Sequence, residues 1–121
     1  MNTILVLDDD RVFCNLIEIM LQLEGYRAVV ISVPEDLIPR ARELKPDLIL
    51  MDVHVANSDT FGVLHDLKAD DLLGGVPVIM TSGIDHGEQC LSAGARAFLF
   101  KPFRPSELLS TISEVLVEPD N

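Results

Sequence analysis

Five short, mostly apolar runs divide this chain, and most of them stop at polar residues. They cover 4–7, 27–31, 48–51, 76–80 and 97–100. Runs of this length are typical of strands rather than helices. Between the runs, apolar residues recur every three or four positions, which predicts amphipathic helices. We therefore expect strands and helices to alternate along the whole chain.

The predicted helices have recognisable start and stop signals. The first carries Phe13 to Leu21 and stops at Gly25. The second covers 34–44, but Pro39 lacks an amide donor and crowds the preceding turn, so we expect a kink or a late helix start there. The others are a short helix carrying Phe61, Leu64 and Leu67 after a polar loop at 54–60, a glycine-interrupted helix at 84–93, and a last helix from about Pro105.

Strand–helix alternation favours a mostly parallel sheet with helices on both faces. Right-handed crossovers make five such units a flavodoxin-like, doubly wound (βα)5 sandwich of the α/β class, for which we predict the strand order 2-1-3-4-5. Ligands of such sheets bind at the carboxyl ends of the strands, where the order reverses between strands one and three. Asp8 and Asp9 are then expected to face Asp52 across that crevice.

Composition narrows the class of protein. With 121 residues, 48% of them apolar, the chain fits one domain, 1–121, with no output domain expected. The charge of −11 disfavours direct binding to nucleic acid or anionic lipid, so we expect protein partners. No run reaches the ~20 apolar residues of a membrane helix. Cys14 and Cys90 are expected to be reduced, buried thiols of a cytoplasmic protein.

Reactive groups follow four of the strand-like runs. The groups are Asp8-Asp9-Asp10, Asp52, Thr81-Ser82 and Lys101. Taken singly, an aspartate here caps a helix or starts a loop, a Thr-Ser pair forms a turn, and a lysine is a solvated surface residue. Together they would emerge at one edge of a parallel sheet. That coincidence favours a site where magnesium assists transfer of a phosphoryl group to Asp52.

The carboxylates have a further physical implication. Clustered aspartates bind hard divalent cations, and magnesium accepts one or two protein carboxylates while keeping waters and phosphate oxygens. Without a counter-charge, Asp8, Asp9 and Asp52 would repel one another. We therefore expect a basic or metal counter-charge near Asp8 and Asp9, and we interpret Asp10 as a helix cap.

These residues stand in the order and spacing of a known family. Over essentially its whole length, the chain resembles the receiver domain of two-component response regulators, including the stand-alone chemotaxis-type regulators. The motifs that carry the resemblance are Ile4-Leu5-Val6-Leu7-Asp8-Asp9-Asp10, Pro46-Asp47-Leu48-Ile49-Leu50-Met51-Asp52, Val76-Pro77-Val78-Ile79-Met80-Thr81-Ser82, Ala93-Gly94-Ala95 and Lys101-Pro102-Phe103.

The resemblance implies a role for each site residue. Asp52 would be the phosphoacceptor, and Lys101, Thr81 and the Ser82 amide would hold the phosphoryl oxygens. Thr81 and Phe98 would form the switch that responds to phosphorylation. The implied metal ligands are Asp8 (mostly through water), Asp9, Asp52 and the backbone carbonyl of His54, and Lys101 would precede a Pro102 that is often cis in this family.

The resemblance also implies partners and a cofactor. The phosphoryl group would come from a histidine kinase or a phosphotransfer protein, and a downstream protein would recognise the phosphorylated form. Magnesium is the expected ion, with manganese as an alternative. The domain would catalyse only its own phosphorylation and dephosphorylation, so we do not expect a conventional enzyme.

Two alternatives stay open at this point. The family usually has proline where Ala56 stands and glycine where Thr60 stands, and the stretch from Thr81 to Gly94 is short. These departures suit a pseudo-receiver, a binding module that signals without phosphorylation. A haloacid-dehalogenase-like phosphatase would instead use Asp8 as nucleophile and Asp10 as general acid, but the chain lacks a late acidic pair and a cap domain.

Overall fold

The computed structural model describes residues 1–117 as alternating strands and helices. The strands of the main sheet are β1 (Thr3–Leu7), β2 (Arg27–Ile31), β3 (Leu48–Asp52), β6 (Val78–Ser82) and β7 (Ala97–Phe100). The helices are α1 (Arg11–Leu23), α2 (Leu37–Leu44), α3 (Phe61–Ala69), α4 (Gly87–Ser92) and α5 (Pro105–Val117). A 3-10 turn at Pro34–Asp36 precedes α2, and β4 (His54–Val55) pairs with β5 (Ser58–Asp59).

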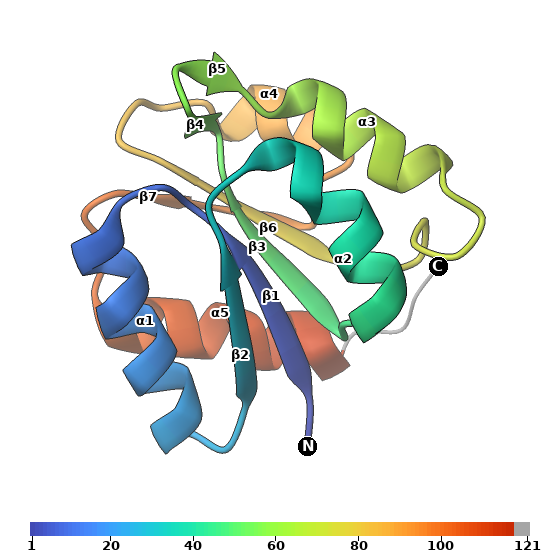
Figure 1. Ribbon diagram of the computed structural model, residues 1–121. Coiled ribbons are helices and arrows are strands. Elements are labelled where there is room, and N and C mark those ends of the chain that lie inside the picture. Colours follow the sequence, from blue (N-terminus) through green and yellow to red (C-terminus); the bar gives the residue numbers. More distant parts are fainter. Residues whose placement is uncertain (118–121) are drawn as a thin grey trace.

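The main sheet is parallel and has the strand order β2-β1-β3-β6-β7. Because β6 and β7 are the fourth and fifth predicted strands, this order confirms the predicted order 2-1-3-4-5 and the flavodoxin-like class. Figure 1 shows the sheet crossing the middle of the molecule, with helices on both sides. The order reverses between β1 and β3, so the carboxyl ends of these two strands border the crevice where such folds bind ligands.

Two hydrophobic clusters lie on opposite faces of the sheet. In β3, Ile49 and Met51 point to the cluster under α2, α3 and α4, while Leu48 and Leu50 point to the cluster under α1 and α5. This alternation explains why β3 is apolar throughout, since both of its faces are buried. Burial of each such side chain contributes about 1.5–3 kcal/mol relative to exposure.

Helix α2 starts late, as Pro39 predicted. The chain makes a 3-10 turn at Pro34–Asp36 and becomes α-helical at Leu37. Pro39 therefore lies in the first turn of α2, where amides have no partner inside the helix and a missing donor costs little. Lys45 ends the helix with a left-handed backbone (φ 51°).

The segments after β3 and after β6 differ from the sequence prediction. The polar loop expected at 54–60 is a tight hairpin in which Ala56 (φ 54°) and Asn57 (φ 63°) turn the chain between β4 and β5. Two consecutive positive φ angles are the signature of a type I′ turn, which a search for Asn-Gly or Gly-Gly pairs misses. Helix α4 begins at Gly87 rather than at Ile84, and the preceding residues form a loop.

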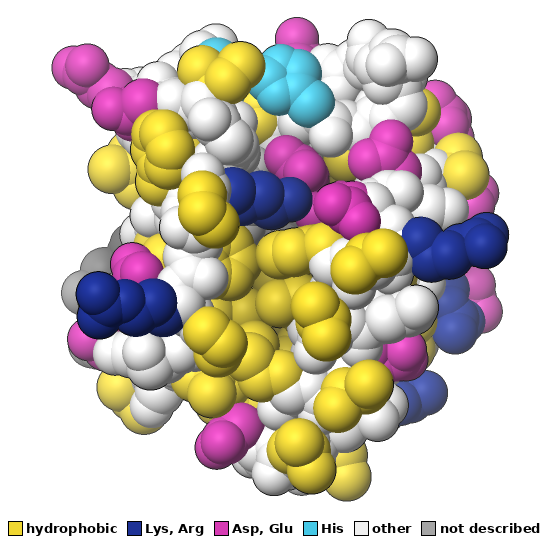
Figure 2. All heavy atoms as spheres, turned by 90° about the vertical axis from the view of Figure 1, so that its left-hand side faces the viewer, with side chains coloured by type: hydrophobic (Ala, Val, Ile, Leu, Met, Phe, Trp, Pro, Cys, Tyr) yellow, Lys and Arg dark blue, Asp and Glu magenta, His cyan; other side chains and the backbone are white. Residues whose placement is uncertain are grey.

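One face of the molecule is unusually apolar. On α1, the side chains of Val12, Leu16, Ile19 and Leu23 recur at helical spacing, and more than half of each residue's surface is exposed. Figure 2 shows hydrophobic side chains gathered across this side of the molecule, beneath a group of acidic side chains. Among the described residues, no helix combines the length and apolar character needed to cross a membrane.

Candidate functional site

The strand register brings the predicted site residues to one edge of the sheet. Asp52 at the end of β3 pairs with Thr81 on β6, and Ser82 pairs with Phe100 on β7. The chain then continues to Lys101, whose amide donates to the Ser82 carbonyl oxygen at 2.8 Å. Residues from three separate parts of the sequence therefore meet because parallel strands end together.

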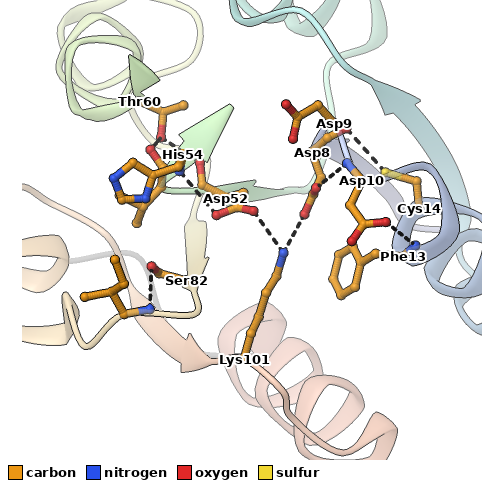
Figure 3. A network of polar contacts seen from close by, with 12 residues as sticks. Asp8, Asp9, Asp10, Phe13, Cys14, Asp52, His54, Thr60, Ser82 and Lys101 are labelled. Atoms are coloured by element: carbon orange, nitrogen blue, oxygen red, sulfur yellow. Dashed lines mark hydrogen bonds and ion pairs between the residues drawn. The ribbon is translucent and has the colours of Figure 1, made fainter. Parts of the chain in front are cut away.

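Lys101 lies between two carboxylates. Its Nζ atom is 2.8 Å from Asp8 Oδ2 and 2.9 Å from Asp52 Oδ2 (Figure 3). Asp8 is almost fully buried, and its other oxygen accepts a hydrogen bond from the Asp10 amide at 2.9 Å. The peptide bond from Lys101 to Pro102 is cis, as the resemblance implied. The basic counter-charge expected near the aspartates is therefore Lys101.

The other two aspartates of the first motif have different partners. Asp9 Oδ2 accepts a hydrogen bond from the Ala56 amide at 2.9 Å, which joins the β1 end to the hairpin. Asp10 is the N-cap of α1, and its Oδ1 accepts from the Phe13 amide at 3.1 Å. The interpretation of Asp10 as a cap is therefore confirmed.

One ammonium group shared by two carboxylates leaves a charge imbalance. Burial raises the pKa of Asp8 above its ordinary value, and the nearby Asp52 charge adds to the shift, although Lys101 and the Asp10 amide oppose it. Burial alone would lower the pKa of Lys101, but its hydrogen bonds to Asp8 and Asp52 outweigh burial and raise it. Lys101 thus stays an ammonium, while its charge offsets only part of the cost of burying the ionised Asp8 carboxylate.

The remaining predicted residues surround this centre. Thr81 and Ser82 are buried, and Ser82 Oγ accepts from the Ile84 amide at 3.0 Å. The His54 side chain is exposed, while its amide donates to Asp52 Oδ1 at 3.2 Å. Phe98 is half-buried on β7, and its ring lies so close to α4 that a Cβ at Gly87 would stand 3.3 Å from it.

The oxygen atoms at this edge suit a hard cation. Asp8, Asp9 and Asp52 come from the two strands that border the crevice, and carboxylates are the oxygen ligands that magnesium accepts. Within residues 1–117, no three acidic, histidine or cysteine side chains are already gathered as a metal cluster. Lys101 contacts the Oδ2 atoms of Asp8 and Asp52, and the Ala56 amide donates to Oδ2 of Asp9.

Sequence reasoning missed two residues beside the site. Thr60 is fully buried, and its Oγ1 donates to the Asp52 carbonyl oxygen at 2.8 Å. The ring of Phe13 lies under Lys101, with Nζ 4.1 Å from the ring centroid. The sequence held one indication of the Phe13 position. Asp10 caps α1, and a capped helix start fixes the direction of the side chains in the first turn. The sequence contains no comparable signal for the Thr60 contact.

Comparison with known proteins identifies the class that this fold and site define. Residues 4–113 match the family model of the response regulator receiver domain, and the chain belongs to this family. The predicted family and fold class are therefore confirmed. Receiver domains are phosphoacceptor signalling domains of two-component systems rather than conventional enzymes, and neither alternative finds support in the comparisons.

Particular relatives resemble the chain over nearly all of its length. The DNA-binding response regulator MtrA of Mycobacterium tuberculosis is 34% identical over 121 residues, covering 98% of this chain and 52% of MtrA. A putative response regulator from Chloroflexus aurantiacus superposes with a TM-score of 0.90 at 25% identity, covering 97% of this chain and 98% of that one. This chain therefore spans about half the length of curated relatives such as MtrA.

A third relative bears on the metal. The receiver domain of the sensor histidine kinase PA1611 from Pseudomonas aeruginosa has a TM-score of 0.87 and 27% identity, covering 97% of this chain and 98% of that one. It is described with a magnesium ion coordinated in its active site cleft. A relative with the same fold is thus described with this ion in its own cleft.

Proposed function

We propose that this receiver domain accepts a phosphoryl group on Asp52 from a phosphohistidine donor, and that the phosphorylated form changes its contacts with other proteins. The observation that carries the proposal is the position of Lys101, whose ammonium contacts Asp8 and Asp52 at 2.8 and 2.9 Å. A cation held at that point can neutralise charge on a group transferred to Asp52.

The proposed step is a displacement at phosphorus. An oxygen of the Asp52 carboxylate attacks and forms the new O–P bond, while the P–N bond to the donor imidazole breaks and the nitrogen takes the electron pair. Lys101 would then hold one phosphoryl oxygen, and the Thr81 hydroxyl and the Ser82 amide the others. Because Thr81 stands beside Asp52 in the sheet register, it is well placed for this contact.

Magnesium is the proposed cofactor, with manganese as an alternative of similar ligand preference. Asp9, Asp52 and the His54 carbonyl would be direct ligands, and Asp8 would act mostly through water. The bound ion would supply positive charge that offsets the phosphoryl oxygens. The carboxylates of β1 and β3 support this assignment because they line the same crevice.

The proposed switch uses Thr81 and Phe98. Phosphorylation adds a charge of about −1.5 to −2 and strong acceptor oxygens beside Thr81. If the Thr81 hydroxyl moves toward those oxygens, the Phe98 ring on the neighbouring strand can move as well, and Phe98 contacts α4 near Gly87. A downstream protein would detect the change on that side of the molecule.

We also infer the setting in which the domain acts. The upstream partner would be a histidine kinase or a phosphotransfer protein, and the chain itself, at −11, would not bind nucleic acid directly. The two cysteines are free and buried, which suits the reducing cytoplasm. We propose 1–121 as one receiver unit. The name of MtrA describes DNA binding for that longer protein, and this inference concerns only the present chain.

Incubation with a small acyl phosphate and magnesium tests the proposal. We expect intact-mass analysis to show one phosphoryl adduct, mapped to Asp52 after trapping, and we expect Asp52→Asn to show none. Omitting magnesium should abolish the adduct. The matched control is Asp47→Asn, which changes an exposed aspartate at the opposite end of β3 and should leave the adduct intact.

Other outcomes would point to the alternatives. Absence of both an adduct and magnesium affinity would favour the pseudo-receiver. Continuous hydrolysis of the acyl phosphate that survives Asp52→Asn but not Asp8→Asn would favour the phosphatase. An adduct on any residue other than Asp52 would contradict the proposal.

A further inference from the structure

The aromatic ring of Phe13 faces the ammonium group of Lys101. The Nζ atom lies 4.1 Å from the ring centroid, within the range of a cation–π contact. Figure 3 shows the ring beside the Lys101 side chain, on the α1 side of the two carboxylates that Lys101 contacts. Lys101 therefore has three neighbours that favour its charge, namely Asp8, Asp52 and the Phe13 ring.

The position of the ring is itself determined by local structure. Asp10 caps α1 and accepts a hydrogen bond from the Phe13 amide, which fixes the backbone of the first turn. On the other side, the Phe13 ring meets the Phe103 ring edge to face, with centroids 5.8 Å apart and planes at 83°. The cap and the second ring together hold the Phe13 ring under Lys101.

On the side away from the two carboxylates, the Lys101 side chain borders an apolar hollow. Phe13, Lys101, Pro102 and Phe103 line an apolar hollow of about 290 Å³, and the Lys101 side chain remains 20% exposed. An ammonium group with access to water could swing out of the site, since lysine has a flexible four-carbon stem. The ring offers the ammonium a favourable surface that does not compete with the carboxylates for its hydrogens.

We propose that Phe13 is a positioning residue for phosphoryl transfer, because its ring face holds the Lys101 ammonium between Asp8 and Asp52. The inference deepens the proposed function and depends on it, since Lys101 must contact the transferred group for the position to matter. The ring acts only through Lys101. A large aliphatic side chain at this place fills the same space but has no negative π face, so it cannot replace the ring.

The first measurement tests the contact without any phosphorylation. Lysine protons above a ring face are shifted upfield in the NMR spectrum by the ring current. We expect upfield-shifted Hε protons for Lys101 in the unmodified chain and in Phe13→Tyr, and ordinary values in Phe13→Leu. Ordinary shifts in the unmodified chain would overturn the proposal, whatever the phosphorylation assay shows.

The second measurement tests the role. With acyl phosphate and magnesium, Phe13→Leu should form the Asp52 adduct about two- to fivefold more slowly, as expected for loss of an exposed cation–π contact, and Phe13→Tyr should keep the original rate. Phe100→Leu is the matched control, because this ring is half-exposed on β7, whereas the ring that the Lys101 Nζ atom faces is that of Phe13. Melting temperatures of all variants verify that each is folded.

The outcomes separate the two proposals. An unchanged rate in Phe13→Leu, with the upfield shift lost, would show that the contact exists but has no positioning role. Equal slowing in Phe13→Tyr and Phe13→Leu would also overturn the inference, since keeping an aromatic ring would then not preserve the rate. If no variant forms an adduct but the upfield shift is present, the proposed function fails and the role fails with it, while the contact itself stands.

Discussion

The hydroxyl of Thr60 donates a hydrogen bond to the backbone carbonyl oxygen of Asp52 at 2.8 Å. The same hydroxyl lies 3.3 Å from the Val53 carbonyl oxygen, and the Thr60 amide donates to that oxygen at 2.8 Å. The residue that follows the hairpin thus returns to the end of β3. These contacts tie the hairpin to the backbone of the proposed phosphoacceptor.

Replacing Thr60 by valine tests this connection. Thr60→Val keeps the shape but leaves the Asp52 carbonyl oxygen without its hydroxyl partner, so we expect a loss of about 1–3 kcal/mol in the free energy of unfolding. Denaturant titration measures it. Thr111→Val is the control, because the Thr111 hydroxyl bonds to a carbonyl oxygen on the exposed side of α5 and its loss should change little. Equal effects of the two substitutions would contradict the prediction.

The hairpin turn contains an alanine in a conformation that favours glycine. Ala56 has φ 54°, where a Cβ atom costs of order 1 kcal/mol. Ala56→Gly removes that cost and keeps the amide that donates to Asp9. We therefore expect the free energy of unfolding to rise by up to about 1 kcal/mol. Ala41→Gly, inside α2, should have the opposite sign, since glycine destabilises the interior of a helix. A lower melting temperature for Ala56→Gly would refute the prediction.

The raised pKa of Asp8 means that its ionised form destabilises the folded protein. Because folding raises the pKa above its ordinary value of 3.8, the protonated form is favoured in the folded state. The resulting stabilisation is present below pH 3.8 and is lost as pH rises through the raised pKa. Above that range, a neutral side chain at this position should therefore be more stable than the carboxylate.

Asp8→Asn tests this sign. Without magnesium, we expect the variant to be more stable than the unmodified chain at neutral pH, and the difference to shrink on acidification toward pH 3.8. Urea titrations over this pH range measure it. Asp10→Asn is the control, since asparagine caps a helix about as well as aspartate. A stability loss for Asp8→Asn that is constant with pH would contradict the assignment.

The thiol of Cys14 should be inert in the folded protein. Its Sγ donates to the Asp8 carbonyl oxygen at 3.3 Å, and burial, with the Asp8 and Asp10 charges, raises its pKa to about 11. At pH 8 only about one such thiol in a thousand is ionised. We expect a disulfide reagent to modify Cys14 only after unfolding in guanidinium chloride. Fast modification of the native protein at Cys14, identified by peptide mapping, would contradict this prediction.

Much of the fold was predictable because it depends on local patterns. The continuous apolar run of 48–51 indicated a strand buried on both faces, and Pro39 indicated the late start of α2. The turn at Ala56 and Asn57 was missed because neither residue is a glycine, and its positive φ angles depend on contacts such as the one between the Ala56 amide and Asp9. Helix α4 is shorter than the predicted range of 84–93, and Phe98 lies close to its first residue, Gly87.

The sequence by itself determined which groups come to the edge of the sheet. Asp8 and Lys101 follow a strand, while Asp52 and Thr81 lie at the carboxyl ends of theirs. Because parallel strands end at one edge, the meeting of these groups follows from the pattern alone. Only the tertiary structure decided which group contacts which: Lys101 with Asp8, Asp52 and Phe13, and Thr60 with the Asp52 backbone. Such contacts depend on side-chain directions and on distances of a few ångströms between residues far apart in sequence, which periodicity does not encode.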